Sequence, residues 1–218
     1  MITVQIASIP ERVESLKRTV ESIYPQVDFV FVALNNYEDV PMFLRGDRKI
    51  ATVCLDNKMT DASKFYNIEE RKDYILTLDD DLVIGKTYAA DMREAVDRYN
   101  CIVSLHGKVY KRPFKNFYAI ERNYRCLSGF AEGGYVDVCG SGVMAWNSSF
   151  FKIKYEDFKS PNMADIWVSK LAHEQKVKMY VLAHTGQYLT HTRFANCICA
   201  EQTKKGHKEE TELLKTFL

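Results

Sequence analysis

Residues 74–83 read YILTLDDDLV, an apolar strand pattern that runs directly into three consecutive acids. Carboxylates gathered at the end of a half-buried strand repel one another and lose hydration unless positive charge lies between them. Alternate side chains of an extended chain share a face, so Asp79 and Asp81 are predicted to point one way and Asp80 the other. Two carboxylates on one face suit Mg²⁺ or Mn²⁺, with ligand phosphates completing the shell. The simpler alternative is a solvated turn, because turns favour Asp.

Apolar strands and helical patterns alternate on both sides of this stretch. Leu16, Val20 and Ile23 recur at helical spacing, and Pro10 precedes them, as a helix start allows. Continuous apolar strands separated by helices predict a parallel sheet covered on both faces, that is, an α/β fold. The predicted strands are 2–7, 27–34, 50–55 and 74–78, and the predicted helices are 11–24, 61–71 and 86–99. The acids therefore stand at the sheet edge where ligands bind in such folds.

The chain becomes less regular after about residue 100. A basic, aromatic stretch at 110–127, which includes Lys111, Arg112 and Lys115, is predicted to be a loop and is a candidate lid. The other predicted elements are strands at 101–105, within 135–146 and at 179–183, and helices at 162–175 and 209–217. The last of these is either a helix or a frayed end. We see no flexible linker between the halves and expect one domain over 1–218.

Composition and charge place the chain among ordinary soluble globular proteins. Its 218 residues are enough for one domain with a sizeable core, and 46% are hydrophobic and 27% charged. Lys plus Arg number 30 and nearly cancel 29 Asp plus Glu. Nucleic-acid-binding domains usually carry a basic excess, so we expect no nucleic acid partner.

Localisation and cysteine chemistry give two further expectations. No apolar run reaches the length of a membrane span and no signal peptide opens the chain, so we expect a soluble, cytoplasmic protein. Cys54 and Cys101 lie in or beside apolar runs and are predicted to be buried free thiols in a reducing compartment. Cys197 and Cys199 could form half of a zinc site, but no second pair with suitable spacing supports one.

The ordered set of stretches resembles the GT-A class of nucleotide-sugar glycosyltransferases. Residues 7–12 (ASIPER) and 16–23 (LKRTVESI) look like the opening of this class, and 78–81 (LDDD) matches its D-x-D motif. Residues 61–65 (DASKF) are similar to a GD-x-x-KF-like segment of some small polysaccharide-type transferases, with Thr60 in place of its usual glycine. Gly140-Ser141-Gly142 and residues 163–167 (MADIW) look like the acceptor-side glycine turn and the acidic helix start. The resemblance spans about 2–191.

The resemblance implies a single GT-A (Rossmann-like) domain with a mostly parallel central sheet flanked by helices. About 1–100 would form the nucleotide-sugar-binding half, and about 101–195 an irregular acceptor-side half. Residues 200–218 would be a charged C-terminal tail.

The same resemblance assigns a metal site to the triplet. Asp81 is the expected ligand of Mn²⁺ or Mg²⁺, and Asp79 shares the metal or contacts the ribose. Many enzymes of the class add a late histidine, for which His191 is the candidate and His184 the rival. Each histidine could equally be an ordinary loop residue.

Asp165 is the candidate base that deprotonates the acceptor hydroxyl. It lies in the first turn of a predicted helix, where the helix dipole stabilises its charge. The alternative is plain helix capping or ordinary first-turn charge. A true base here implies a single displacement with inversion at the sugar carbon, whereas the lack of a reachable base would favour a retaining mechanism.

The remaining site residues are implied by their places along the chain. Gly140 and Gly142 would allow close approach of backbone to substrate, although a plain turn explains them as well. Trp146 and Trp167 could stack on a sugar, but core packing is the simpler role for each. The expected nucleotide-sugar contacts are Ser8, Ile9, Arg12, Asn35, Asp56, Lys64, Asp79 and Asp80, and the expected acceptor-side residues are Gly140, Gly142 and Trp167.

The sequence hypothesis is therefore a metal-dependent hexosyltransferase that uses a nucleotide sugar, with a UDP-sugar as the expected donor and a glycan or glycoprotein hydroxyl as the acceptor. The first alternative is a nucleotidyltransferase, which typically has a glycine-rich phosphate loop after its first strand; residues 8–12 (SIPER) contain no glycine. The second is a non-catalytic nucleotide- or carbohydrate-binding module. The third, a DNA-modifying glucosyl-type transferase, is disfavoured by the near-neutral charge.

Overall fold

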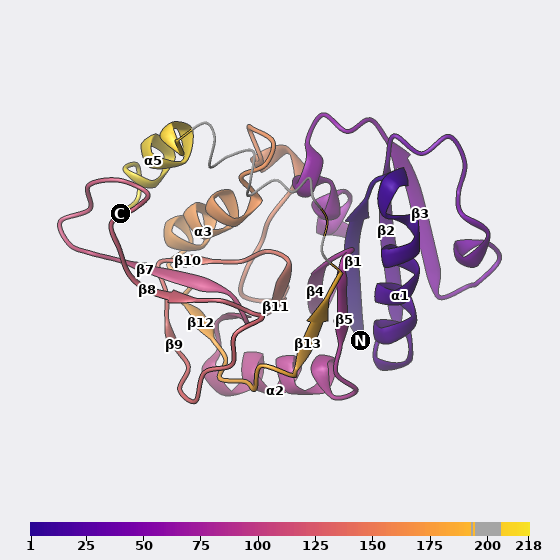
Figure 1. Ribbon diagram of the computed structural model, residues 1–218, viewed down its shortest axis with the longest axis horizontal. Coiled ribbons are helices and arrows are strands. Elements are labelled where there is room, and N and C mark those ends of the chain that lie inside the picture. Colours follow the sequence, from indigo (N-terminus) through magenta and orange to yellow (C-terminus); the bar gives the residue numbers. More distant parts are fainter. Residues whose placement is uncertain (193, 195–205) are drawn as a thin grey trace.

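The computed structural model describes residues 1–192, 194 and 206–218, which form a mixed α/β fold around an eight-stranded sheet (Figure 1). The strand order is β3-β2-β1-β4-β11-β6-β12-β9. The strands of this sheet are β1 (Ile2–Ser8), β2 (Phe29–Asn35), β3 (Ile50–Leu55), β4 (Tyr74–Asp79), β6 (Ile102–Ser104), β9 (Gly134–Tyr135), β11 (Val143–Asn147) and β12 (Met179–Val181).

The sheet is mostly parallel. β1 pairs in parallel with β2 and β4, β2 with β3, and β6 with β12. The exceptions are β11, antiparallel to both β4 and β6, and the short edge strand β9, antiparallel to β12. The prediction of an α/β fold with a mostly parallel central sheet is confirmed.

Both faces of the sheet are covered, as continuous apolar strands require. Leu76 and Leu78 of β4 pack in one core cluster with the buried faces of α1 (Val13–Ile23) and α2 (Tyr88–Tyr99). Ile75 of the same strand points the other way, into a second cluster with α3 (Ala164–Glu174) and the 3₁₀ segment η4 (Thr60–Phe65). β4 is therefore buried on both sides and is fixed in register by its packing.

Two smaller sheets and a terminal helix complete the structure. β7 (Gly107–Tyr110), β8 (Ile120–Tyr124) and β10 (Val138–Cys139) form one sheet, and β5 (Leu82–Ile84) pairs with β13 (Leu189–His191) in the other. Helix α5 (Lys208–Leu214) lies beside α3 at the far end of the molecule from α1 (Figure 1). The remaining 3₁₀ segments are η1 (Pro10–Arg12), η2 (Tyr24–Gln26), η3 (Met42–Leu44), η5 (Ile68–Glu70) and η6 (Tyr155–Asp157).

The structure corrects three predictions. The helix expected at 61–71 is two 3₁₀ segments, η4 and η5, interrupted by Asn67 with a left-handed φ of 52°. The loop expected at 110–127 contains β8, because this stretch pairs with β7. Cys54 is exposed rather than buried, since β3 is an edge strand with one partner, whereas Cys101 is buried as predicted.

None of the helices in the described part of the chain is long and apolar enough to cross a membrane. The Cys197–Cys199 pair lies outside the described residues.

Candidate functional site

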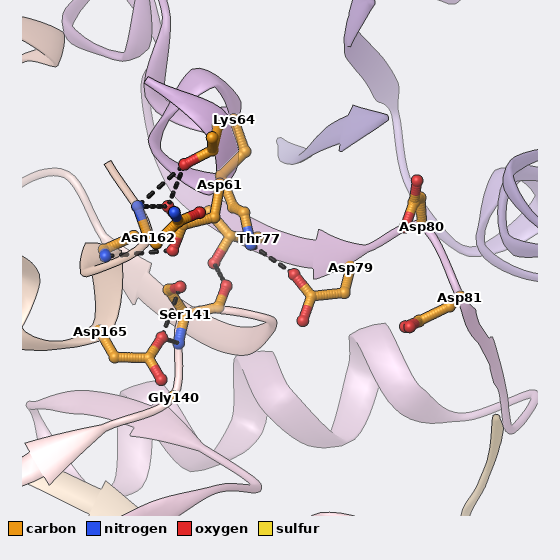
Figure 2. Close-up of polar contacts among 12 residues, drawn as sticks. Asp61, Lys64, Thr77, Asp79, Asp80, Asp81, Gly140, Ser141, Asn162 and Asp165 are labelled. Carbon is orange, nitrogen blue, oxygen red and sulfur yellow. Dashed lines mark hydrogen bonds and ion pairs between the residues drawn. The ribbon is translucent and has the colours of Figure 1, made fainter. Parts of the chain in front are cut away.

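The acid triplet lies at the carboxyl end of β4, at the middle of the large sheet. Asp79 is the last residue of β4, and Asp80 and Asp81 form the turn into β5. The strand ends before the triplet does, so strand alternation alone does not orient all three side chains. Figure 2 nevertheless shows Asp81 turned back toward Asp79 while Asp80 points away. The predicted division between the pair and Asp80 agrees with this arrangement.

Arg12 supplies much of the positive charge that the triplet requires. Its Nη1 donates to Asp80 Oδ1 at 2.9 Å and lies 3.6 Å from Asp81 Oδ2. The side chain of Asp80 is only 4% exposed, and burial raises its pKa although Arg12 acts to lower it. The guanidinium also lies 4.8 Å from the ring centroid of Phe194, a cation–π contact. Arg12 and Asp80, two of the predicted nucleotide contacts, are thus bonded to each other.

His191 is the histidine that the fold brings to the triplet. β13 pairs with β5 so that His191 lies opposite Leu82, and its Nε2 is 3.3 Å from Asp81 Oδ2. The rival, His184, donates from Nε2 to the backbone oxygen of Cys126 at 2.7 Å. Burial and the charges of Asp79 and Asp80 raise the pKa of Asp81 to about 6. Asp81 therefore lies where negative charge is in excess.

The chemistry of these groups fits a divalent cation only in part. Asp81 and His191 offer an oxygen and an imidazole nitrogen side by side; the carboxylate suits Mn²⁺ or Mg²⁺, whereas imidazole is a ligand of transition metals. Across residues 1–192, 194 and 206–218, however, no three His, Cys, Asp or Glu side chains are grouped as a ready-made metal site. The third predicted ligand, Asp79, is bonded to Lys64. The metal stays a prediction, with Asp81 and His191 as the residues that would hold it.

Asp79 forms an ion pair with Lys64, which extends from η4. The Lys64 side chain is 2% exposed, whereas that of Asp79 is 48% exposed. Desolvation of the partly buried Asp79 carboxyl acts to raise its pKa. The ion pair with Lys64 lowers the pKa by more, so the net pKa of Asp79 is lowered. Burial likewise acts to lower the pKa of Lys64, yet Asp79 and Asp61 raise it overall. Lys64, a predicted nucleotide-sugar contact, is thus bonded to a protein carboxylate.

Asp165 lies in the first turn of α3 and faces the glycine turn between β10 and β11. Its Oδ1 accepts hydrogen bonds from the backbone N–H and the hydroxyl of Ser141, at 2.7 Å each. It does not cap α3. That role falls to Asp61, whose Oδ2 accepts from Ala164 N–H at 3.1 Å and whose Oδ1 accepts from Asn162 N–H at 2.9 Å. The capping part of the alternative for Asp165 therefore loses its support, whereas the first-turn charge stands, because Asp165 lies in the first turn of α3.

The two glycines of the turn are packed for different reasons. A Cβ on Gly142 would lie 2.0 Å from Asp79 Oδ2, so glycine at this position lets the carboxylate lie against the backbone. A Cβ on Gly140 would lie 2.7 Å from the Cβ of His106. Both positions require glycine because a neighbouring side chain lies against the backbone. Of the two, Gly142 is the glycine that contacts the acid triplet.

The other predicted nucleotide contacts gather at the same sheet edge. Ser8 and Ile9 end and follow β1, Asn35 ends β2, and Asp56 follows β3. Asn35 Nδ2 donates to Thr60 O at 3.0 Å, while its buried Oδ1 has no hydrogen-bond partner among the described residues. Asp56 is exposed and pairs with Lys58. Parallel strands end together, which explains the gathering.

The aromatic candidates and one unpredicted histidine lie around this centre. Trp146 is fully buried in the core, and Trp167 is partly buried with its Nε1 donating to Ser160 Oγ at 2.9 Å. His106 was not predicted. It follows β6, packs against Gly140 and lies within the electrostatic reach of Asp165 and Asp79, while burial lowers its pKa. Its place two residues after the end of β6 was the signal available in the sequence.

Comparison with known proteins shows the fold. No family model matches the chain, and no curated protein matches it. Among solved structures, S. aureus TarS 1-349 in complex with UDP-GlcNAc is similar with a TM-score of 0.61 and 14% identity, over 91% of this chain and 60% of that one. TarS 1-349 gives 0.53 at 12% identity over 84% and 58% of the two chains. A third structure, of TarS, gives 0.51 at 12% identity over 88% and 36%. The chain thus spans 60%, 58% and 36% of the lengths of these three structures.

Proposed function

We propose that this protein is a GT-A-type hexosyltransferase that moves a sugar from a nucleotide-sugar donor, a UDP-sugar, to a hydroxyl of a glycan or glycoprotein. One observation carries the proposal: a carboxylate triplet lies at the carboxyl end of β4, in a fold similar to that of TarS, one of whose crystal structures is a complex with UDP-GlcNAc. Ligands of open α/β sheets bind at this carboxyl edge.

The donor side of the proposed site consists of the strand ends around the triplet. Ser8, Ile9, Asn35 and Asp56 lie where a base and ribose would be bound. Asp81 and His191 would hold Mn²⁺ or Mg²⁺, which when bound neutralises a diphosphate leaving group as a Lewis acid. Arg12 keeps Asp80 and Asp81 in place and limits their mutual repulsion.

The acceptor side of the proposed site is the turn at Ser141 and the start of α3. Asp165 uses Oδ1 for both bonds from Ser141, which fixes the carboxylate, and Figure 2 shows its other oxygen directed away from Ser141. We assign that oxygen to the acceptor hydroxyl, whose proton it would take as attack begins. The expected outcome is inversion at the sugar carbon.

The decisive experiment is thermal denaturation with UDP, UDP-GlcNAc, UDP-glucose, GDP and ADP, each with and without Mn²⁺. A ligand that binds only the folded state raises Tm. At a hundredfold excess over Kd it increases the free energy of unfolding by about 2.7 kcal/mol. We expect a Mn²⁺-dependent rise with a uridine ligand, lost in Asp81→Ala and kept in Asp39→Ala, an acid with a 92% exposed side chain. No rise with any nucleotide and metal would refute the proposal.

Product analysis separates the remaining alternatives. Release of UDP from the donor supports sugar transfer, and release of pyrophosphate from UTP would identify a nucleotidyltransferase. Nucleotide binding without either product, across a panel of sugar acceptors, would identify a binding module. The anomeric configuration of the product, read by NMR, distinguishes inversion from retention.

A further inference from the structure

Lys64 lies between carboxylates that belong to opposite sides of the site. Its ammonium is bonded to Asp79 on the donor side, and its charge also acts on Asp61 and Asp165. The side chain is 2% exposed, so nearly all of its hydration is lost in the folded protein. A desolvated ammonium is stable only where opposite charge compensates it. Here three carboxylates share that role.

Asp61 connects Lys64 to the acceptor side through the backbone. Both residues belong to the single 3₁₀ segment η4. Asp61 accepts hydrogen bonds from the N–H groups of Asn162 and Ala164, and α3 has no capping side chain at its own N-cap, Met163. The start of α3, and with it Asp165, is therefore anchored on the segment that carries Lys64 (Figure 2).

The connection closes into a ring through the glycine turn. Asp165 holds Ser141, and Thr77 Oγ1 donates to Ser141 O at 2.5 Å. Gly142, the next residue, accepts a hydrogen bond from Asp79 N–H at 3.0 Å and packs against its carboxylate. The sequence of contacts runs from Lys64 to Asp79, through the turn to Asp165, and back by way of α3 and Asp61.

We propose that Lys64 is a positioning residue: its buried ammonium bridges the donor-side and acceptor-side carboxylates and keeps Asp79 and Asp165 at a fixed separation. Without it, Asp79 would lose its hydrogen-bonded cation, and Asp61 and Asp165 would lose the compensating charge of the buried ammonium. The assignment of donor and acceptor sides rests on the proposed function, whereas the bridge itself rests on the contacts.

The test of the bridge is a double-mutant cycle read by Tm. In the wild-type background, Asp79→Asn should lower Tm, because it removes the direct partner of the buried ammonium. In a Lys64→Met background the same change should raise Tm, because it removes an uncompensated charge. This reversal of sign is the expected result. Shifts of the same sign and size in both backgrounds would overturn the proposal.

A second variant keeps the test decisive if Lys64→Met does not fold. The double variant Lys64→Met/Asp79→Asn removes the cation together with its direct partner and should recover a cooperative melt. Failure to recover one would contradict the bridge. Lys49→Met, a partly buried lysine away from this ring, is the matched control and should leave the Asp79→Asn shift unchanged.

Kinetics then separate positioning from simple stabilisation. In folded Lys64→Met we expect KM for the UDP-sugar to rise at least tenfold and kcat to fall at least tenfold, because both ends of the ring move. A purely structural lysine would leave KM unchanged. Wild-type protein that binds no nucleotide would refute the proposed function and leave the Tm cycle to decide on the bridge.

Discussion

Ionisation of Asp81 lowers the stability of the folded protein. Its pKa rises from an ordinary 3.8 to about 6, so the folded state binds this proton more tightly than the unfolded chain does. The stability gained by protonation is complete below pH 3.8 and is lost as the pH rises through 6.

The neutral variant Asp81→Asn should therefore be more stable than the wild type at neutral pH. We expect little difference in Tm at pH 4, a growing gain between pH 4 and 6, and a constant gain above pH 7, measured without metal or nucleotide. Asp39→Asn is the control and should show no such pH-dependent gain, because its side chain is 92% exposed. A gain that is independent of pH would contradict the assignment of the shift to Asp81.

Gly142 gives a steric prediction at the same scale. Gly142→Ala would place a methyl group 2.0 Å from Asp79 Oδ2, and the carboxylate is held on its other side by Lys64. We expect a destabilisation of about 1–3 kcal/mol from overpacking and a loss of nucleotide-dependent stabilisation. Gly186→Ala, where the nearest atom to the new Cβ is Gly129 N at 3.3 Å, is the control. Equal behaviour of the two variants would mean that Asp79 moves freely.

Helix α5 shows how an element at the end of the chain is tied to the rest. Leu214 is fully buried in a cluster with Tyr110, Val138 and Ile166, which come from β7, β10 and α3. Leu214→Ala should cost about 2–5 kcal/mol, the usual range for truncating a buried leucine. Urea denaturation measures this loss, and Glu212→Ala, an exposed neighbour in the same helix, should change stability little. A negligible loss at Leu214 would show that α5 does not pack as described.

The elements that sequence patterns predicted are those set by local periodicity. β1, β3, β4, α2 and α3 were predicted within about two residues, because their apolar faces repeat at strand or helix spacing. Several short strands depend on partners elsewhere in the chain and were missed: β8 pairs with β7, and β5 pairs with β13. The break at Asn67 was missed for a local reason, because no periodicity encodes its left-handed backbone.

The residues of the candidate site likewise fall into those that sequence patterns predicted and those that they did not. The acids, His191 and the strand-end residues were predicted because they follow strands, and the ends of parallel strands meet at one edge. Arg12 and Lys64 were predicted to contact the nucleotide sugar. Nothing in the sequence around them reveals that Arg12 pairs with Asp80 and Lys64 with Asp79. His106 was missed for the related reason that its neighbour Gly140 is far from it in sequence.

At the scale of the whole molecule, the central sheet joins the two halves of the sequence. β11, from the irregular second half, lies between β4 and β6 and pairs with both. Its Val143 and Ala145 pack in the cluster that includes α1 and α2, and its Met144 and Trp146 pack in the cluster that includes α3. Neither cluster can lose this strand and remain packed.

This arrangement predicts a single cooperative unfolding transition. Thermal melts followed by far-UV circular dichroism, which reports on all elements, and by tryptophan fluorescence, which reports on Trp146 and Trp167 in the α3 cluster, should coincide. Ala145→Gly, at the centre of β11, should shift both melts downward together by the same amount, because one strand serves both clusters. Two separated transitions, or a shift confined to the fluorescence melt, would mean that the halves unfold as independent units and that the sheet is not continuous across β4, β11 and β6.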